Sequence, residues 1–283
     1  MRFPFLDRKD ELARLRAVFG ARAPGLAVVF GRRRLGKSRL IQEALAGRQA
    51  VYFVGDEGDS PLQREALARE IAGIITGFAD VRYPDWSALL ERYFREAPAG
   101  AVLAIDELPS LVRAAPELPS VLQKVLDARK RPTQVVLAGS SQRMMHGLVL
   151  EGSAPLYGRA QELLKLGPLP IGWLEQGLRI RTAHAAVEAW SMFGGVPRYW
   201  ELARDFGLAR DALSALVLDP LGVLHGEPQR LLYDELDDAA RASSVLALVA
   251  GGSHRASEIA SRIGMPVTTL ARPLAKQIGR AHV

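Results

Sequence analysis

The sequence contains no cysteine and no long apolar run. The absence of cysteine among its 283 residues excludes disulfide bonds, zinc sites with thiolate ligands and cysteine nucleophiles. No apolar stretch approaches the roughly 18 residues that a membrane-spanning helix needs. Residues 1–12 are charged where a secretory signal would carry an apolar segment. We therefore expect a cytoplasmic protein that does not enter a membrane.

Histidine is also scarce. The five histidines show no metal-ligand spacing, and no Ser-His-Asp order points to hydrolase chemistry of that kind; they are His146, His184, His225, His254 and His282. By contrast, 48% of the residues are hydrophobic and 24% are charged, which is typical of a globular protein and excludes a disordered or fibrous chain. A chain of this length predicts roughly two domains.

The net charge of +6 is unevenly distributed. Residues 1–50 carry 12 Lys/Arg against 4 Asp/Glu, whereas the remaining residues carry 25 against 27. Much of the local excess lies in Arg32, Arg33, Arg34, Lys37 and Arg39. A phosphate-bearing ligand explains such a cluster as well as a DNA backbone does, so the charge alone does not select between them.

A strand, a glycine-rich loop, a helix and a second strand are predicted near the N-terminus. Residues 26–30 (LAVVF) form a short apolar run of the kind expected for a parallel strand buried on both faces. Residues 39–46 have helical character, and residues 50–54 form another apolar run. This order indicates a βαβ unit with the glycine loop at its first turn.

The loop matches the pattern G-x-x-x-x-G-K-[ST], which binds phosphates in the context of a strand followed by a helix. Its residues are Gly31, Arg32, Arg33, Arg34, Leu35, Gly36, Lys37 and Ser38. Backbone N–H groups would surround the β-phosphate of ATP, Lys37 would reach the β- and γ-phosphates, and the Ser38 hydroxyl would bind Mg²⁺. The alternative is a chance glycine turn.

Two carboxylates follow a second apolar run, residues 101–105. Asp106 and Glu107 stand at the predicted carboxyl end of this strand, where ligands bind in open α/β sheets. Asp106 is the candidate Mg²⁺ ligand, and Glu107 is the candidate base that orients and deprotonates the attacking water. A strand followed by a solvated acidic turn is the alternative.

Two further residues are candidates for a role in catalysis. Ser140 follows the apolar run 134–139, where it would touch the γ-phosphate or the attacking water. Its alternative role is to cap the next helix, and Ser141 is equally suited to that role. Arg159 precedes a fifth strand-like run at residues 162–166. It would neutralise charge in the transition state, either in cis or in trans, or it is an ordinary surface arginine.

Together these segments resemble the AAA-type ATPase family of archaea and bacteria, which is related to the STAND NTPases. The matching segments appear in the family's order over roughly residues 3–200; they are FLDRKDELARL, GRRRLGKSRLI, LAIDEL, VVLAGSS, LYGRA and FGGVPRY. By this resemblance Arg159 stands at the family's LYGR arginine. Gly194, Gly195 and Pro197 stand at a Gly-Gly-x-Pro turn that senses the nucleotide in a helical lid.

The resemblance implies a P-loop NTPase fold of the AAA+/ASCE type: an α/β, doubly wound parallel sheet with a helical lid and a partial winged-helix domain. We expect the ATPase core in residues 1–168, the lid in residues 169–218 and the partial winged helix in residues 219–283. Members of the family often end in a nuclease-like domain that this chain would lack.

The C-terminal region predicts a helix-turn-helix. Residues 253–270 indicate a helix, a turn with Gly264 and the start of another helix, a unit that contacts DNA in many proteins. Pro273 interrupts the second helix, so a plain helical packing module is the alternative. The last six residues look foreign to the protein, which suggests a truncated reading frame.

The sequence therefore predicts a protein that binds ATP and Mg²⁺ and hydrolyses ATP. One hypothesis is a conformational switch coupled to a DNA or protein partner. The other is an oligomeric motor or remodeller in which Arg159 of a neighbouring subunit completes each site. A scaffold that does not hydrolyse ATP is disfavoured, because both acidic residues are present.

Overall fold

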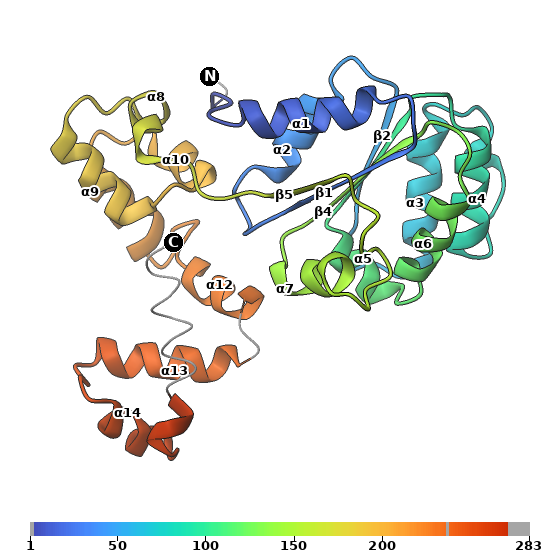
Figure 1. Cartoon of the computed structure of the whole chain (residues 1–283). Coiled ribbons are helices and arrows are strands. Elements are labelled where there is room, and N and C mark those ends of the chain that lie inside the picture. The colour runs from blue at the N-terminus through green and yellow to red at the C-terminus, as the bar shows by residue number, and fades with distance from the viewer. Residues whose placement is uncertain (1–2, 236–237, 271–283) are drawn as a thin grey trace. The chain divides into compact units, whose positions relative to one another are not determined.

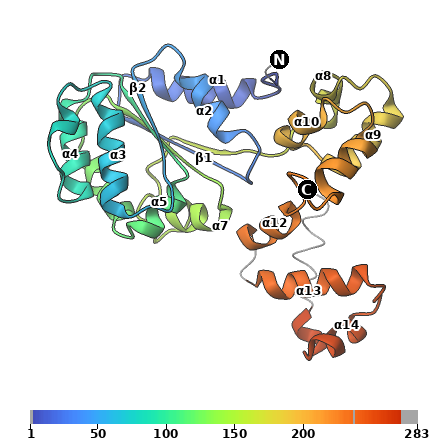
Figure 2. The same cartoon turned by 180° about the vertical axis from the view of Figure 1, so that it is seen from behind.

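The computed structural model describes residues 3–235 and 238–270 (Figures 1 and 2). The chain forms two compact units, Met1–Ala209 and Arg210–Val283. Pro273 and the last six residues, on which two expectations rest, lie outside the described residues. The predicted division into core, lid and C-terminal region stays a prediction.

A parallel sheet of five strands forms the centre of the first unit. The strands are β1 (Gly25–Phe30), β2 (Ala50–Val54), β3 (Val102–Asp106), β4 (Gln134–Gly139) and β5 (Glu162–Lys165). Their order is β2-β3-β4-β1-β5, with parallel pairs such as Val28 opposite Leu137. This sheet confirms the predicted α/β P-loop fold. Strand β4 lies between the strands that precede the glycine loop and the acidic pair.

Helices cover both faces of the sheet, as a doubly wound fold requires (Figure 1). Helices α1 (Lys9–Gly20) and α2 (Lys37–Leu45) pack on one face, against Ala27 and Val29 of β1. On the other face, Leu26 and Val28 belong to a core shared with the helices between β2 and β4. Both faces of β1 are therefore buried, which explains its continuous apolar sequence.

The helices that cover the second face lie between β2 and β5 in the sequence. They are α3 (Ser60–Ala72), η1 (Phe78–Asp80), α4 (Trp86–Glu96), α5 (Leu108–Ala114), α6 (Leu118–Ala128), α7 (Gln142–Met145) and the π-helical turn η2 (His146–Leu150). The α4 helix starts where the Asp85 carboxylate accepts the Ala88 N–H at 2.8 Å. Its apolar stripe, which includes Trp86, Leu89 and Tyr93, is buried in the core.

Short helices follow β5 within the first unit. They are η3 (Ile171–Trp173), α8 (Leu174–Leu178), α9 (Ala183–Phe193) and α10 (Pro197–Ala203). The turn between α9 and α10 needs its second glycine, because a Cβ atom on Gly195 would lie 2.1 Å from the carbonyl oxygen of Leu169. Trp200 is fully buried and donates its indole N–H to the Gly194 carbonyl at 2.6 Å. The Gly-Gly-Val-Pro segment is thus a tightly packed turn.

The second unit is helical where the structure describes it. Its elements are α11 (Ala209–Leu213), which begins at the boundary, the π-helical turn η4 (Ser214–Leu218), α12 (Glu227–Glu235), α13 (Ala239–Ala250) and α14 (Ala256–Ile263). Val245, Ile259 and Leu270 share a small apolar core. Helix α14 ends at Gly264, whose φ of 71° is left-handed, and residues 267–270 are again helical.

Within residues 3–235 and 238–270, no helix combines the length and the apolar character that crossing a membrane requires.

Candidate active site

The glycine loop joins the end of β1 to the first turn of α2, as the sequence predicts. Three of its residues have positive φ angles, Gly31 (148°), Arg34 (67°) and Gly36 (89°). A Cβ atom on Gly31 would lie 2.5 Å from the carbonyl oxygen of Leu166, so any larger residue would push β1 and the chain after β5 apart. The second glycine directly precedes the helix and gives the left-handed turn at its start.

Lys37 points back into the loop from the first position of α2. Its Nζ donates hydrogen bonds of 2.9 Å to the carbonyl oxygens of Gly31 and Arg32 and to the Oγ of Ser140. The side chain is only 4% exposed. Burial lowers the pKa of Lys37, while the charges of Glu107 and Asp106 oppose that shift. An ammonium group held this way is already placed inside the loop that would receive phosphates.

Ser140 connects Lys37 to Glu107. Its hydroxyl donates to Oε1 of Glu107, and its backbone N–H donates to Oε2 of the same carboxylate at 3.2 Å. The backbone of Glu107 is left-handed, with φ of 52° and ψ of 43°, an unfavourable conformation for a residue other than glycine. The hydroxyl of Ser141 instead accepts the Met144 N–H at 3.3 Å and caps α7. Ser141 therefore takes the capping role, and a contact of Ser140 with the γ-phosphate or the attacking water stays a prediction.

Asp106 is held by two hydrogen bonds at the end of β3. Its Oδ1 accepts the backbone N–H of Glu107 at 2.9 Å, and its Oδ2 accepts the phenolic O–H of Tyr52 at 2.7 Å. Asp106 is 1% exposed. Burial and this carboxylate raise the pKa of Tyr52, while the neighbouring side chains of Ser38 and Gln42 act in the opposite direction. The phenol is therefore a hydrogen-bond donor at neutral pH.

The residues near Asp106 fit a magnesium ion that shares its ligands with a nucleotide. Asp106 supplies a buried carboxylate, and Ser38 supplies a hydroxyl beside Tyr52. Both are the oxygen ligands that Mg²⁺ prefers. Within the described ranges no cluster of three or more His, Asp or Glu residues forms a metal site by itself. Phosphate oxygens of the nucleotide and water would supply the remaining ligands of the ion.

The structure does not bring Arg159 to the loop. Two nitrogens of its guanidinium donate to the Asp127 carboxylate near the end of α6, Nε to Oδ1 and Nη2 to Oδ2, at 2.8 Å each. Two residues later, Gln161 donates its N–H to the carbonyl of Leu26 at the start of β1. Arg159 thus lies near the amino edge of the sheet, roughly 15 Å along β1 from the glycine loop. A role in cis has no support in this arrangement.

Four residues predicted from the sequence meet here, Lys37, Asp106, Glu107 and Ser140, whereas Tyr52 is a member of the site that the sequence did not predict. Strand β2 is a uniformly apolar run in the sequence, although its first four residues alternate between half-buried and buried in the structure. What the sequence does not reveal is that β2 pairs with β3, placing Tyr52 opposite Ala104, two residues before Asp106. Only this pairing shows that the single tyrosine of β2 reaches the carboxylate.

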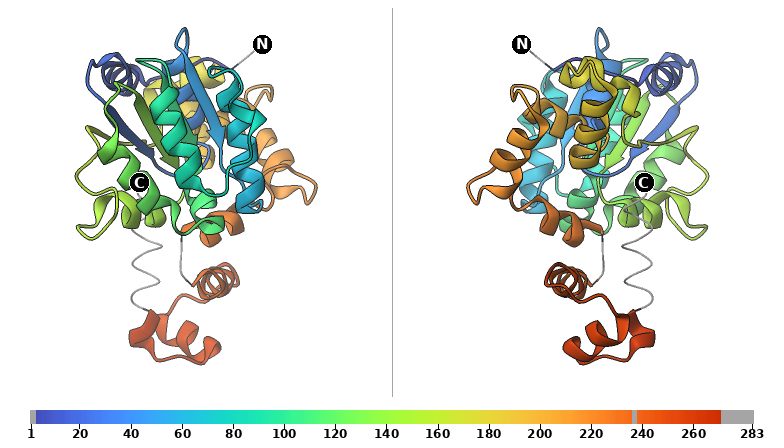
Figure 3. Two further views of the ribbon diagram at one scale, coloured as in Figure 1. Left: turned by 90° about the vertical axis from the view of Figure 1, so that its right-hand side faces the viewer. Right: turned by 90° about the vertical axis from the view of Figure 1, so that its left-hand side faces the viewer.

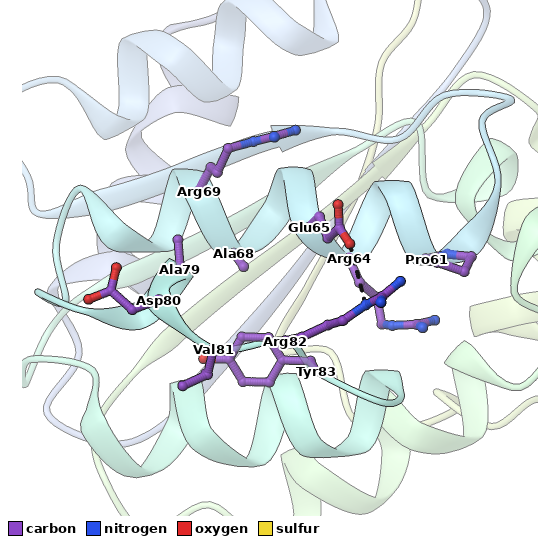
Figure 4. Close-up of a pocket in the computed structure, with 10 residues that line it drawn as sticks. All are labelled: Pro61, Arg64, Glu65, Ala68, Arg69, Ala79, Asp80, Val81, Arg82 and Tyr83. Carbon is purple, nitrogen blue, oxygen red and sulfur yellow. Dashed lines mark ion pairs between the residues drawn. The ribbon is translucent and has the colours of Figure 1, made fainter.

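A separate cavity of about 500 Å³ lies between α3 and residues 79–83 (Figure 4). None of its lining residues belongs to the loop or to the ends of β3 and β4. The Arg82 guanidinium reaches across it to Glu65, with 3.7 Å between Nε and Oε1. Arg64 donates to the Ser60 hydroxyl and the Pro84 carbonyl. Charges of both signs line this cavity, and we assign it no part in the active site.

These features of the sheet define a P-loop nucleoside triphosphatase. Its parallel sheet carries a glycine loop after one strand and acidic residues after another, with a further strand between these two. Comparison with known protein families shows to which family of P-loop proteins the chain belongs. Residues 5–202 match an ATPase domain found predominantly in Archaea, and the chain belongs to this family of AAA-type ATPases. The chain therefore contains an ATPase domain, of a class of domains that bind nucleotides.

Similar proteins are found by sequence and by fold. An uncharacterized protein of Methanocaldococcus jannaschii is 28% identical over 263 residues, which is 92% of this chain but 57% of the relative. The chain thus spans little more than half the length of that protein. A Walker-type ATPase of Pyrococcus abyssi has a similar fold (TM-score 0.66, 21% identity, 95% of this chain and 88% of that one). The ORC2 protein of Aeropyrum pernix is also similar (TM-score 0.57, 15% identity, 93% and 80%).

Proposed function

We propose that the protein binds ATP with Mg²⁺ in the loop Gly31–Ser38 and hydrolyses it as a conformational switch coupled to a DNA or protein partner. One observation carries this proposal: the hydrogen-bonded chain from Lys37 through Ser140 to Glu107. It joins residues from three separate segments that sequence reasoning had assigned to one reaction. Such a contiguous set links the group that binds phosphate to the group that would act on water.

In the proposed reaction, each residue has a role that its position supports. Lys37 exchanges carbonyl and hydroxyl partners for the β- and γ-phosphates. Ser38 and Asp106 would hold Mg²⁺, which on binding neutralises charge on the phosphate oxygens. Glu107 accepts a proton from the attacking water. Ser140 orients the Glu107 carboxylate until a γ-phosphate offers its hydroxyl another acceptor.

One contact between the loop and α10 supports a lid role for the helices after β5. The guanidinium of Arg34 in the loop lies 5.8 Å from the ring centroid of Tyr199 in α10. Since a bound phosphate would attract Arg34, its arrival would compete with this cation–π contact. We propose that α8, α9 and α10, with the turn at Gly194, Gly195 and Pro197, act as the lid that distinguishes ATP from ADP.

The C-terminal unit is the proposed link to a partner. Helix α14, the turn at Gly264 and the helical residues 267–270 follow the order of a helix-turn-helix. The ORC1 protein of Aeropyrum pernix, which has a similar fold (TM-score 0.53, 14% identity, 100% of this chain and 85% of that one), was solved in complex with DNA. We propose that residues 219–283 include a partial winged helix that contacts DNA. DNA binding that is absent or insensitive to ionic strength would argue against it.

The alternative is an oligomeric motor in which Arg159 acts on a neighbouring subunit. The position of Arg159 favours this role over one in cis, because the side chain is 29% exposed at the edge of the sheet away from its own loop. An interface that brought a second loop to this edge would have to replace Asp127 as the partner of Arg159.

Glu107→Gln tests the proposed hydrolysis. We expect ATP turnover to fall by about 10²- to 10⁴-fold, the usual contribution of a general base. Binding of ATP, measured as thermal stabilisation, should be retained because Lys37 and the loop remain. The matched control is Glu70→Gln on the exposed surface of α3, which should hydrolyse ATP at the parental rate. Parental turnover in Glu107→Gln would require a different base.

A further inference from the structure

A second cavity, of about 360 Å³, lies between the last turns of α4 and α6. These two helices are neighbours on the same face of the sheet, in teal and green in Figure 3 (left). Both end where the chain turns toward the amino ends of β3 and β4, so the cavity lies at the sheet edge opposite the glycine loop. Its floor includes Phe94, Val125 and Ala128. We call it the amino-edge pocket.

The amino-edge pocket is strongly basic. Five of the nine residues that line it are cationic and one is acidic; the cations are Arg95, Lys124, Arg129, Lys130 and Arg131. The acid, Glu91, already accepts from Lys124 at 3.2 Å and from Ser87 at 2.8 Å. Arg95, in the last turn of α4, pairs with Glu96, with 3.2 Å between Nη2 and Oε1, and Arg131 donates to the Ala97 carbonyl at 3.1 Å. These partners do not satisfy the whole set.

Arg129 is the least satisfied of these cations. Its Nε and Nη1 are shielded from solvent and have no hydrogen-bond partner within the part of the chain that the structure describes. The guanidinium lies 5.9 Å from the ring centroid of Phe94, on the apolar floor. Burial lowers its pKa to about 10, so it is charged at neutral pH. Buried N–H donors of a cation without an acceptor are costly and usually indicate a missing partner.

Asp127, two residues before Arg129, favours the charged form of Arg129 but accepts no hydrogen bond from it. Both carboxylate oxygens of Asp127 are engaged by Arg159, at 2.8 Å each. The hydroxyl of Tyr93 is also buried without a hydrogen-bond partner in the described residues. The pocket therefore combines an apolar floor, a guanidinium with two N–H donors that lack acceptors in the described residues, and a basic rim.

We propose that the amino-edge pocket binds an acidic peptide segment of a partner protein, with one carboxylate directed to Arg129 and an adjacent apolar side chain on the Phe94 floor. The volume is close to the lower end, about 300 Å³, of sites that hold small ligands, which suits one or two side chains. A DNA backbone offers phosphates but no apolar group for the floor. Because the pocket lies away from the loop, the proposal does not depend on ATP hydrolysis.

Fluorescence anisotropy of the full chain tests this proposal. The probe is a short fluorescein-labelled peptide of alternating Glu and Leu, with a Lys and Leu peptide as its counterpart. We expect the acidic peptide alone to bind, and binding to weaken with rising ionic strength. Arg129→Met, which keeps an apolar stem, should weaken it at least tenfold. Lys130→Glu, on the exposed rim, should weaken it without disturbing the core.

Arg69→Met provides the matched control, since Arg69 is an exposed arginine of α3 outside this pocket. It should bind the acidic peptide as the parent does, and all variants should retain the thermal stabilisation produced by ATP. No binding of the acidic peptide at about 1 mM would overturn the proposal. Equal loss in Arg69→Met would overturn it too, because attraction would then be non-specific. Displacement of the peptide by duplex DNA that itself requires Arg129 would identify a DNA site instead.

Discussion

The phenolic oxygen of Tyr52 lies 2.7 Å from Oδ2 of Asp106 and donates a hydrogen bond to it. Oδ1 of the same carboxylate accepts the Glu107 N–H, so both oxygens are oriented from within the protein. Loss of a group that orients a metal ligand typically weakens metal affinity by about 10- to 100-fold. Tyr52 is therefore a positioning residue for the proposed Mg²⁺ site, acting through Asp106.

Tyr52→Phe should weaken the apparent affinity for Mg²⁺ by about tenfold, because one oxygen of Asp106 loses its donor while the packing of the ring is preserved. The measurement is a Mg²⁺ titration of the thermal stabilisation produced by ATP. High Mg²⁺ should restore the stabilisation, which a merely structural defect would not allow. Tyr157→Phe, at an exposed tyrosine, is the control. An unchanged Mg²⁺ midpoint in Tyr52→Phe would contradict the role.

The Arg159–Asp127 pair gives a pH-dependent prediction for stability. Hydrogen bonds from Arg159 hold the pKa of Asp127 below its ordinary value of 3.8. A carboxylate with a lowered pKa stabilises the folded state at pH above that ordinary value, and this contribution is lost as the pH falls through the folded pKa. Asp127→Asn should therefore destabilise the protein by about 1 kcal/mol or less at pH 7, since the pair is partly exposed.

Denaturant unfolding of both proteins at a series of pH values measures this difference. It should disappear below the folded pKa of Asp127, where the parent has also lost the charge. A difference that persists unchanged in acid would mean that the carboxylate contributes through packing and not through its charge.

Arg159→Ala distinguishes the two proposed uses of ATP. A switch that works within one chain predicts turnover within about twofold of the parent, because Arg159 lies at the sheet edge opposite the loop. A motor predicts an inactive variant whose activity returns when it is mixed with inactive Glu107→Gln subunits. Loss of turnover without recovery on mixing would contradict both uses and indicate a role in cis.

Much of the fold follows from local sequence features. The sequence predicts all five strands within two residues of where they lie. For β1, β3 and β4 the reason is that a parallel strand buried on both faces is a continuous apolar run. The loop and the acidic pair were expected together because each ends such a strand. Ser140 was left with two roles, and the structure separates it from Ser141 through their different hydrogen bonds.

The remaining relationships depend on which strands and helices are neighbours. The pairing of β2 with β3 brings Tyr52 to Asp106, and no local pattern specifies that pairing. Similarly, Arg159 meets Asp127 only because α6 and the chain before β5 end at the same sheet edge. Gly195 reads as a helix break in the sequence, whereas its requirement for a hydrogen side chain comes from the Leu169 carbonyl beside it.

The central claim, that ATP binds in the loop around Lys37, is tested most directly by ATP-dependent thermal stabilisation of Lys37→Ala. The parent should gain about 2.7 kcal/mol at an ATP concentration one hundred times the Kd, and so should Lys9→Ala, at an exposed lysine of α1. Lys37→Ala should show no stabilisation by ATP. Stabilisation equal to that of the parent would place the nucleotide elsewhere and contradict the account.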